Sequence, residues 1–450
     1  MTHRSASDVI VPSSPTRRVL IVVSAFNPAM VADMQRARML SWELPKLGWE
    51  VEVLTPRARE VRQDVVEPQP AEFFPTDTRV HQVGSIAAGL FAALGSRSHS
   101  WRTLWTMRQR GDELIRSNRF DLVFFTTTTF IYFSLGPRWR RKFAIPYVID
   151  FHDPWVRDDA VALRPRNWKR PLIERLSIHM ERASVVDATG LVAVSPRYIE
   201  TLRRRYGVWN PLWLARNRHA VIPFGALGTD LAEAAKTAKC DRQRSADELA
   251  IHYVGVGGAI MSRSFALICR ALALLRAQGN PLIDRVRIRL FGTTYNWKPG
   301  DAKPLQLAAQ EAGVGDLVTE IPERVSYRRS LELLLESDGA LILGVDDSGY
   351  MPSKLFAYAL SGRPLLASLR KDSPAFARFQ DSPDLGNAVW FDQHGDMPLT
   401  DALAVVNKFL QQAANRQSFD RNEMLKPFLA PAMAGRHAEL FNACLERGNS

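Results

Sequence analysis

The first strongly apolar run of the chain is Val19-Leu-Ile-Val-Val23, and this run decides the fold class. Its length and its β-branched residues predict a strand that is buried on both faces. A helix-patterned stretch follows at residues 33–47, Gly48 ends it, and Val51-Glu-Val-Leu-Thr55 predicts a second strand. Continuous apolar strands joined by helices are typical of parallel α/β sheets that helices cover on both faces.

The same alternation recurs along the chain in two series, separated by residues 226–248, which lack an apolar run. We predict further strands at residues 120–125, 146–150, 191–195 and 220–225 in the first series, and at residues 251–255, 286–291, 317–321, 339–343, 364–367 and 388–391 in the second. The sequence therefore predicts two doubly wound, Rossmann-like domains, with ligands bound beyond the carboxyl ends of strands in a cleft between them. The expected division is a disordered segment at 1–17, domains at 18–225 and 249–415 joined by a linker at 226–248, and a C-terminal helical segment at 416–450.

Composition and charge exclude several classes of protein. The 450 residues include 46% hydrophobic and 24% charged residues, as in folded soluble domains. A net charge of +12 indicates an anionic partner. Cys240, Cys269 and Cys444 are too far apart for a disulfide scaffold or a zinc ribbon and favour a reducing compartment. Because no run approaches the roughly 18 apolar residues of a membrane span, we expect a cytoplasmic protein or one attached to the cytoplasmic face of a membrane.

Half of the net positive charge of the chain lies in one segment. Residues 102–142 carry nine Arg or Lys and three acidic residues, a net charge of +6, and the apolar stretch 86–94 and Trp101 come just before them. Residues 164–175, with Trp168, repeat the pattern. Basic residues beside Trp and Leu predict a segment in an anionic membrane interface. The alternative is a solvated basic helix whose tryptophans pack into the core. Nucleic acid is not expected, because no recognition motif accompanies the charge.

Four segments, in their order along the chain, resemble the two-domain GT-B glycosyltransferases, in particular the family 4-like retaining enzymes. Residues 19–55 look like the first βαβ unit of the family, and Asp150-Phe-His-Asp-Pro-Trp155 is similar to an Asp-Phe-Arg-Asp-Pro-Trp loop of one of its branches. Residues 191–197 with 221–225 look like the end of its acceptor domain, and Pro352-Ser-Lys-Leu-Phe-Ala-Tyr-Ala-Leu-Ser-Gly-Arg-Pro-Leu-Leu-Ala367 is similar to its donor-site helix. The resemblance covers residues 18–410. It implies an acceptor-side first domain, a nucleotide-sugar-binding second domain, and metal-independent, retaining hexosyl transfer.

The sequence departs from the family at two places. The family usually carries two glutamates seven residues apart, the second of which accepts hydrogen bonds from a ribose; here these places fall at Tyr350 and Ala357. The usual Gly-Gly pair of the first loop is replaced by Met30-Val-Ala-Asp33. Two alternatives to a transferase therefore stay open: a nucleotide-sugar epimerase on the same fold, and a non-catalytic scaffold in a glycan assembly complex.

A nucleotide-diphosphate leaving group needs cations or helix N-terminal amides to neutralise it. Ser353 and Lys354 follow Pro352, where a helix is expected to start, and predict a phosphate clamp; an ordinary helix cap with a solvated lysine is the alternative. The Gly-rich turn at 255–258 precedes a helix that carries Arg263 in its first turn. The resemblance places Arg324 near the nucleobase. The expected donor-binding residues are Gly255, Gly257, Gly258, Arg263, Arg324, Ser353, Lys354 and Leu355.

The loop after the strand at 146–150 supplies the expected acceptor side. We predict Asp153 and His152 as catalytic residues that orient an acceptor hydroxyl or stabilise developing positive charge on the sugar. Trp155 would stack on a sugar, and Arg36 would meet an anionic acceptor or the diphosphate. A capping Asp-Pro turn beside a packed tryptophan is the alternative. No metal is expected, because no other ligand accompanies the pair at residues 346–347. The expected partners are a nucleotide-sugar, a glycan or lipid-linked acceptor of surface glycan biosynthesis, and the inner face of the cell membrane, where the protein would be peripheral.

Overall fold

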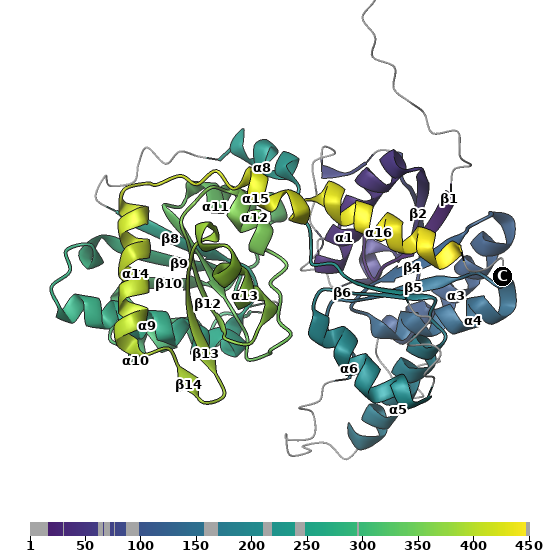
Figure 1. Ribbon diagram of the computed structural model, residues 1–450, viewed down its shortest axis with the longest axis horizontal. Helices are drawn as coiled ribbons and strands as arrows, with labels where there is room; N and C mark the ends of the chain where they lie inside the picture. The colour runs from purple at the N-terminus through teal and green to yellow at the C-terminus, as the bar shows by residue number, and fades with distance from the viewer. Residues whose placement is uncertain are drawn as a thin grey trace, which may run out of the picture.

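The computed structural model describes residues 17–29, 31–61, 66, 73–75, 77–86, 99–156, 170–209, 218–238, 248–294 and 297–446. These residues form two α/β halves, each built on a seven-stranded sheet (Figure 1). The predictions for residues 1–16, 87–94, 157–169, Met30 and Cys240 concern positions outside the described residues.

The sheet of the N-terminal half has the strand order β3-β2-β1-β4-β5-β6-β7, and all of its neighbouring strands are parallel. Its strands are β1 (Arg17–Val22), β2 (Trp49–Pro56), β3 (Arg79–Val83), β4 (Leu122–Thr126), β5 (Tyr147–Phe151), β6 (Gly190–Ala193) and β7 (Arg218–Val221). Alternate residues of β1 enter different apolar clusters, Val19 and Ile21 on one face and Leu20 and Val22 on the other. Both faces of this strand are therefore buried, as its continuous apolar run predicts.

The sheet of the C-terminal half repeats this topology with the order β10-β9-β8-β11-β12-β13-β14. Its strands are β8 (Leu249–Val254), β9 (Val286–Phe291), β10 (Val318–Ile321), β11 (Gly339–Leu343), β12 (Leu365–Arg370), β13 (Asn387–Asp392) and the short antiparallel β14 (Gly395–Asp396). The prediction of a two-domain α/β fold is confirmed. The sequence analysis missed β3 and β14.

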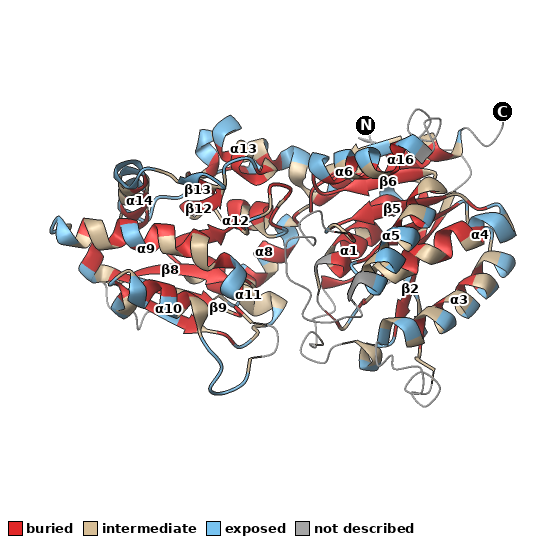
Figure 2. Cartoon of the chain, turned by 90° about the horizontal axis from the view of Figure 1, so that it is seen from below, coloured by how far each residue is buried: buried red, intermediate tan, exposed pale blue. Residues whose placement is uncertain are grey.

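The helices lie on the outside of both sheets, and most of them bury one face (Figure 2). In the N-terminal half they are α1 (Ala32–Glu43), α3 (His99–Ser117), α4 (Leu135–Phe143), α5 (Arg170–Val186), α6 (Pro196–Tyr206) and the 3-10 segment η5 (Phe130–Ser134). In the C-terminal half they are η8 (Gly258–Met261), α9 (Ser262–Ala277), α10 (Pro304–Glu311), α11 (Tyr327–Glu336), α12 (Leu355–Leu360), α13 (Pro374–Asp381) and α14 (Leu399–Ala414). The segment predicted as a linker contains α8 (Gly228–Ala235).

The chain crosses between the halves twice, and the two crossings run side by side. After α14 it passes through α15 (Asn422–Leu425) and η12 (Lys426–Phe428), and then α16 (Ala430–Leu445) returns to the N-terminal half beside α1 (Figure 1). The amide of Ala226 donates to the carbonyl of Phe428 at 3.2 Å, and the amide of Ala430 donates to the carbonyl of Ala226 at 2.9 Å. The C-terminal helix therefore belongs to the core of the half where the chain begins.

One helical stretch in the described part of the chain, Gly258–Ala277, has the length and apolar composition of a membrane span. Half of its most apolar window is buried within the protein. Residues such as Phe265 and Leu272 belong to the apolar cluster over the second sheet, so this stretch is a core helix of the C-terminal half.

We predict that Phe441→Ala destabilises the N-terminal half by about 3–5 kcal/mol, the usual cost of such a cavity. Phe441 is fully buried on α16, and its ring packs against Trp49 at 5.5 Å and Phe124 at 5.1 Å between centroids. Urea unfolding measures the change, with exposed Glu439→Ala on the same helix as the control. Equal unfolding of both variants would show that α16 does not support this half.

Candidate active site in the cleft between the halves

A cavity of about 330 Å³ lies where the two halves meet. We call it the α12 pocket. From the N-terminal half, α1 and the crossing at residues 224–227 line it, and from the C-terminal half the ends of β8 and β9 and the segments 324–331 and 350–358 line it. Its position beyond the carboxyl ends of parallel strands is where open α/β sheets bind ligands. The predicted residues Gly255, Arg324, Ser353 and Lys354 all line it.

Lys354 is a basic residue of the α12 pocket that has no acidic partner among the described residues. Its Nζ donates to the carbonyl of Val254 at 3.0 Å and to Oη of Tyr253 at 3.3 Å, and lies 4.4 Å from the centre of the Tyr253 ring. Lys354 makes no ion pair with any residue that the structure describes. Burial disfavours the charged ammonium and lowers its pKa from 10.5 to about 7. An anion entering the pocket would supply the missing countercharge.

Gly255 is required for the position of this ammonium group. A Cβ at residue 255 would lie 2.0 Å from Nζ of Lys354, and the backbone there has a φ of +136°, which side-chain-bearing residues rarely adopt. The carbonyl of Val254 accepts from both Lys354 and Oη of Tyr358, the latter at 2.7 Å. The glycine predicted to approach a phosphate therefore also makes room for the lysine.

The rim of the pocket carries an ion pair that sequence reasoning missed. Arg38 on α1 donates to both carboxylate oxygens of Asp230 on α8, and Oη of Tyr327 on α11 donates to the same carboxylate at 2.7 Å. Burial, with the adjacent carboxylate, raises the pKa of Tyr327 above its usual range. These groups are as much as 289 residues apart along the chain, so no local motif marks them. The contacts among these three residues join the two halves beside the pocket. The carboxylate of Asp230 neutralises the charge of Arg38.

The start of α12 differs from its prediction. The helix begins at Leu355, so Pro352 is not its first residue, and Ser353 and Lys354 lie in the turn before it. Since α12 spans only six residues, Lys354 and not a helix terminus is the main positive group at this wall. Leu355 is buried in the core beneath the pocket. Tyr350 and Ala357, at the places of the usual glutamates, line the pocket, so this wall has no carboxylate at either place.

Arg263 does not line the α12 pocket. Its guanidinium lies over the ring of Phe391 and donates to Asp396 at 3.0 Å and to the carbonyl of Asp392 at 2.6 Å. Its predicted donor-binding role lacks support from this geometry, because α9 directs the side chain towards β13 and β14. Gly257 and Gly258 form the turn before α9; a Cβ at residue 257 would lie 2.6 Å from Sδ of Met261.

The predicted acceptor residues divide between a buried network and the surface. Nε of Arg36 lies 2.9 Å from Oδ2 of Asp150, and Nε2 of His152 lies 2.5 Å from the same oxygen. Although burial alone would raise the pKa of Asp150, Arg36 and His152 hold it well below its usual range. Arg36 is fully buried, so in this structure its predicted contact with an acceptor is blocked. Asp153 is exposed, and Trp155 stacks on Phe130 at 5.7 Å.

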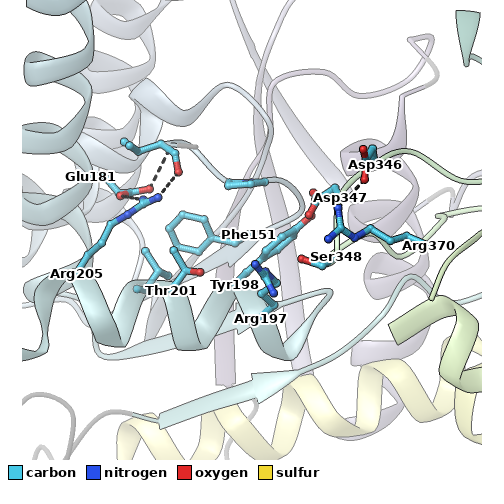
Figure 3. A pocket seen from close by; sticks show the side chains of 13 residues that line it. Phe151, Glu181, Arg197, Tyr198, Thr201, Arg205, Asp346, Asp347, Ser348 and Arg370 are labelled. Carbon is cyan, nitrogen blue, oxygen red and sulfur yellow. Dashed lines mark hydrogen bonds and ion pairs between the residues drawn. The ribbon is translucent and has the colours of Figure 1, made fainter. Parts of the chain in front are cut away.

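No group of three or more His, Cys, Asp or Glu side chains is arranged to hold a metal ion among the residues that the structure describes. A second cavity, of about 190 Å³, also lies between the halves and is lined by α6 and by residues 346–348 (Figure 3). We call it the α6 pocket. Asp346 and Asp347 line this cavity and not the α12 pocket.

Comparison with known proteins identifies the architecture. Residues 34–225 match the model of the glycosyl transferase 4-like domain. The structure is similar to HepE of Anabaena in complex with UDP-glucose, with 12% identity, a TM-score of 0.57 and coverage of 95% of this chain and 99% of that one. It is also similar to an alpha,alpha-trehalose 6-phosphate synthase of Burkholderia multivorans, with 12% identity, a TM-score of 0.58 and coverage of 96% and 100%. A comparison with curated proteins finds no match. The predicted GT-B fold is confirmed.

We predict that Lys354 titrates near pH 7, because its burial favours the neutral amine. Reductive methylation with a ¹³C label, followed by NMR over pH 5–11, measures the midpoint of each lysine. Lys354→Arg identifies the signal, and exposed Lys46 is followed in the same spectra as a surface lysine for comparison. A Lys354 midpoint above about 9.5 would show that the site is open to solvent.

Proposed function

From a glycosyl transferase 4-like domain on a GT-B fold, we propose that the protein transfers a sugar from a nucleotide-diphosphate sugar to a lipid-linked or polysaccharide acceptor in surface glycan biosynthesis. The α12 pocket holds the donor, and the N-terminal half holds the acceptor. Transfer retains the configuration of the sugar. The protein works in the cytoplasm, peripheral on the inner face of the cell membrane.

The observation that carries the proposal is the side-chain amine of Lys354, which forms no ion pair with a described residue and lies against the glycine turn after β8. Charge develops on the diphosphate as the sugar leaves, and a positive group already held in place stabilises this charge at little reorganisation cost. A charge-assisted contact from Lys354 serves the purpose that a bound cation serves in other transferases. We therefore propose a donor site without a metal ion, in which Ser353 and Arg324 make further contacts.

One observation favours the alternative of a non-catalytic scaffold, namely Tyr350 and Ala357 in the pocket wall where the family usually has glutamates. Incubation with UDP-, GDP- and ADP-sugars separates the alternatives. Hydrolysis or transfer supports the transferase, and interconversion of sugars without an acceptor supports an epimerase. Nucleotide binding without any turnover supports the scaffold.

We predict that Lys354→Ala weakens UDP binding by at least tenfold, since a hydrogen bond to a charged group contributes about 1.5–3 kcal/mol. Calorimetry with UDP, GDP and ADP identifies the base, and the nucleotide that binds is then titrated into the variant. Lys46→Ala, an exposed lysine of the N-terminal half, is the control and keeps wild-type affinity.

The same contact makes binding depend on pH. A bound diphosphate favours the ammonium and raises the pKa of Lys354 in the complex above its free value of about 7. The contact is therefore fully available below pH 7 and weakens as the pH rises, by up to tenfold per pH unit, until the raised pKa is passed. Affinity that is equal at pH 6.5 and 8.5, or unchanged in Lys354→Ala, contradicts the clamp.

The surface proposed for membrane contact includes only part of the basic segment that the sequence indicated. On α4, Trp139 is fully buried, and Arg138 and Lys142 both bind Asp112, at 2.8 and 2.7 Å. This part of the basic segment is therefore structural, with Trp139 in the core.

Several of the exposed apolar residues lie at the starts of α3 and α5. Trp101 and Trp105 are exposed on α3, and Arg108 lies over the ring of Trp105 at 4.9 Å. On α5, Leu172, Ile173 and Leu176 are exposed, Leu172 to 69%. The segment η5 contacts both helices. Apolar side chains flanked by arginines fit an anionic bilayer surface, where the former enter the interface and the latter meet lipid phosphates.

We predict that the protein floats with vesicles of phosphatidylglycerol and phosphatidylcholine but not with phosphatidylcholine alone. The double variant Leu172→Asp, Ile173→Asp reduces flotation at least fivefold, because it places charge in the interface. Leu307→Asp, at an exposed leucine of the C-terminal half, is the control. Since salt at 1 M shortens the screening length to about 3 Å, it weakens the binding. A wild-type protein that stays unbound at low salt contradicts membrane contact.

A further inference from the structure

The α6 pocket is a second cavity of the cleft, on the other side of the loop that leads to α12. Residues 346–348 of this loop line the α6 pocket, whereas Tyr350 and Ser353 line the α12 pocket. The walls come from both halves: α6 and the end of β5 on one side, and the ends of β11 and β12 on the other (Figure 3). Two ligands, one in each cavity, would therefore face each other across a single loop.

Most charges of the α6 pocket already have partners. Glu181 accepts from Arg205 at 2.9 Å and from the amide of Val156 at 3.2 Å. Asp346 accepts from Arg370 at 2.5 Å. These pairs lie at opposite ends of the cavity in Figure 3, with Tyr198 and Thr201 between them. The pairs fix the walls and leave their own charges largely neutralised.

Two charged groups of this cavity have no ionic partner among the described residues. Arg197, in the first turn of α6, is exposed and makes no hydrogen bond or ion pair within that part of the chain. Its charge acts on Asp372 only at longer range. Asp347 accepts from neutral donors, the amide of Gly349 at 2.8 Å and Oη of Tyr198 at 3.4 Å. The cavity therefore has a guanidinium, that of Arg197, which can bind an anionic group. It also has a carboxylate, that of Asp347, which can accept hydrogen bonds from hydroxyl groups.

The remaining wall is apolar or aromatic. Phe151, Pro154, Val156 and Leu202 line the cavity, and in Figure 3 the ring of Tyr198 lies near Phe151. The volume of about 190 Å³ is below the 300–1,000 Å³ of pockets for drug-sized ligands, and it suits a single sugar-sized unit. An apolar wall with a few convergent polar groups suits a sugar ring, which has C–H faces and hydroxyl edges.

We infer that the α6 pocket binds the anionic sugar unit of the acceptor, a sugar that carries a phosphate or a carboxylate. Arg197 binds the anionic group, Asp347 accepts hydrogen bonds from ring hydroxyls, and Thr201 and Ser348 contact the remaining hydroxyls. The inference rests on the proposed function, because it names the substrate that receives the sugar from the α12 pocket.

The position of α5 fits an acceptor that stays attached to a lipid. Glu181 of α5 lines the α6 pocket, and Ile173, eight residues earlier, is exposed at the proposed membrane surface. Eight residues of α-helix span about 12 Å. A lipid-linked glycan can extend over this distance from the proposed membrane surface to the pocket. The sugar unit can therefore enter the pocket while its lipid remains in the bilayer.

Ligand-observed NMR with the full-length protein tests the inference, using glucose 6-phosphate and glucuronic acid as probes and neutral glucose for comparison. Both anionic sugars bind saturably and at least tenfold more tightly than glucose. Arg197→Gln lowers their affinity at least tenfold, whereas Arg204→Gln, an exposed arginine of the same helix, leaves it unchanged. Asp347→Asn weakens all three sugars, because it removes the acceptor for ring hydroxyls.

Two further measurements separate this site from the donor site. Saturating UDP and the variant Lys354→Ala both leave binding of glucose 6-phosphate unchanged if the probe occupies the α6 pocket. Displacement by UDP, equal affinity for glucose, or full affinity in Arg197→Gln overturns the inference. Such a result with intact nucleotide binding leaves the proposed function standing, whereas a wild type that binds none of UDP, GDP and ADP refutes the proposed function itself.

Discussion

The buried ion pair between Arg36 and Asp150 joins the parts of the protein that form the cleft. It connects α1 to the end of β5, and NH2 of Arg36 also donates to the carbonyl of Ile222 at 2.8 Å, where the chain starts its first crossing. His437 on α16 lies 3.4 Å from NH1 of Arg36, and its Nδ1 lies 2.7 Å from the carbonyl of Met433. Burial and the guanidinium lower the pKa of His437 to about 3, so it is neutral and accepts from Arg36. Removing one partner of such a pair leaves a buried charge, at a cost of about 3–5 kcal/mol.

This network also determines what the cleft offers to a ligand. The guanidinium of Arg36 lies 4.8 Å from the centre of the Phe224 ring, and His152 makes an edge contact with the same ring, with 4.8 Å between the ring centres. Phe224 lines the α12 pocket and separates these charges from it. The N-terminal wall is therefore apolar at this point, and Lys354, on the opposite half, is the basic residue that we propose for the diphosphate. His152, which the sequence suggested as a catalytic residue, therefore affects the pocket through its contact with the Phe224 ring.

The apolar runs were sufficient to predict most of the sheets, because strands buried on both faces have continuous apolar sequences. The edge strand β3 was missed since its sequence, Arg79-Val-His-Gln-Val83, is polar and mostly exposed. In the site, the local spacing of Ser353 and Lys354 was informative, and so was the glycine turn. The partnership of Arg38 with Asp230 was not predictable, because it depends on how the two halves meet. Arg263 was assigned to the donor from its position in the first turn of α9, whereas the direction of its side chain, towards Asp396, is a tertiary property.

The basic residues of the chain divide between two roles once the structure is considered. Arg36, Arg38 and Arg138 form ion pairs with buried or partly buried carboxylates. Their charges are therefore neutralised within the protein and are not available to bind a ligand. Lys354 and Arg197 are cations of the cleft that form no ion pair in the described part of the chain, and they lie in different pockets. Two separate cations suit a reaction between two anionic substrates, since each substrate then carries its own countercharge and the two repel each other less across the loop at residues 346–353. The proposed donor and acceptor sites therefore each draw on a different basic residue, Lys354 in the α12 pocket and Arg197 in the α6 pocket.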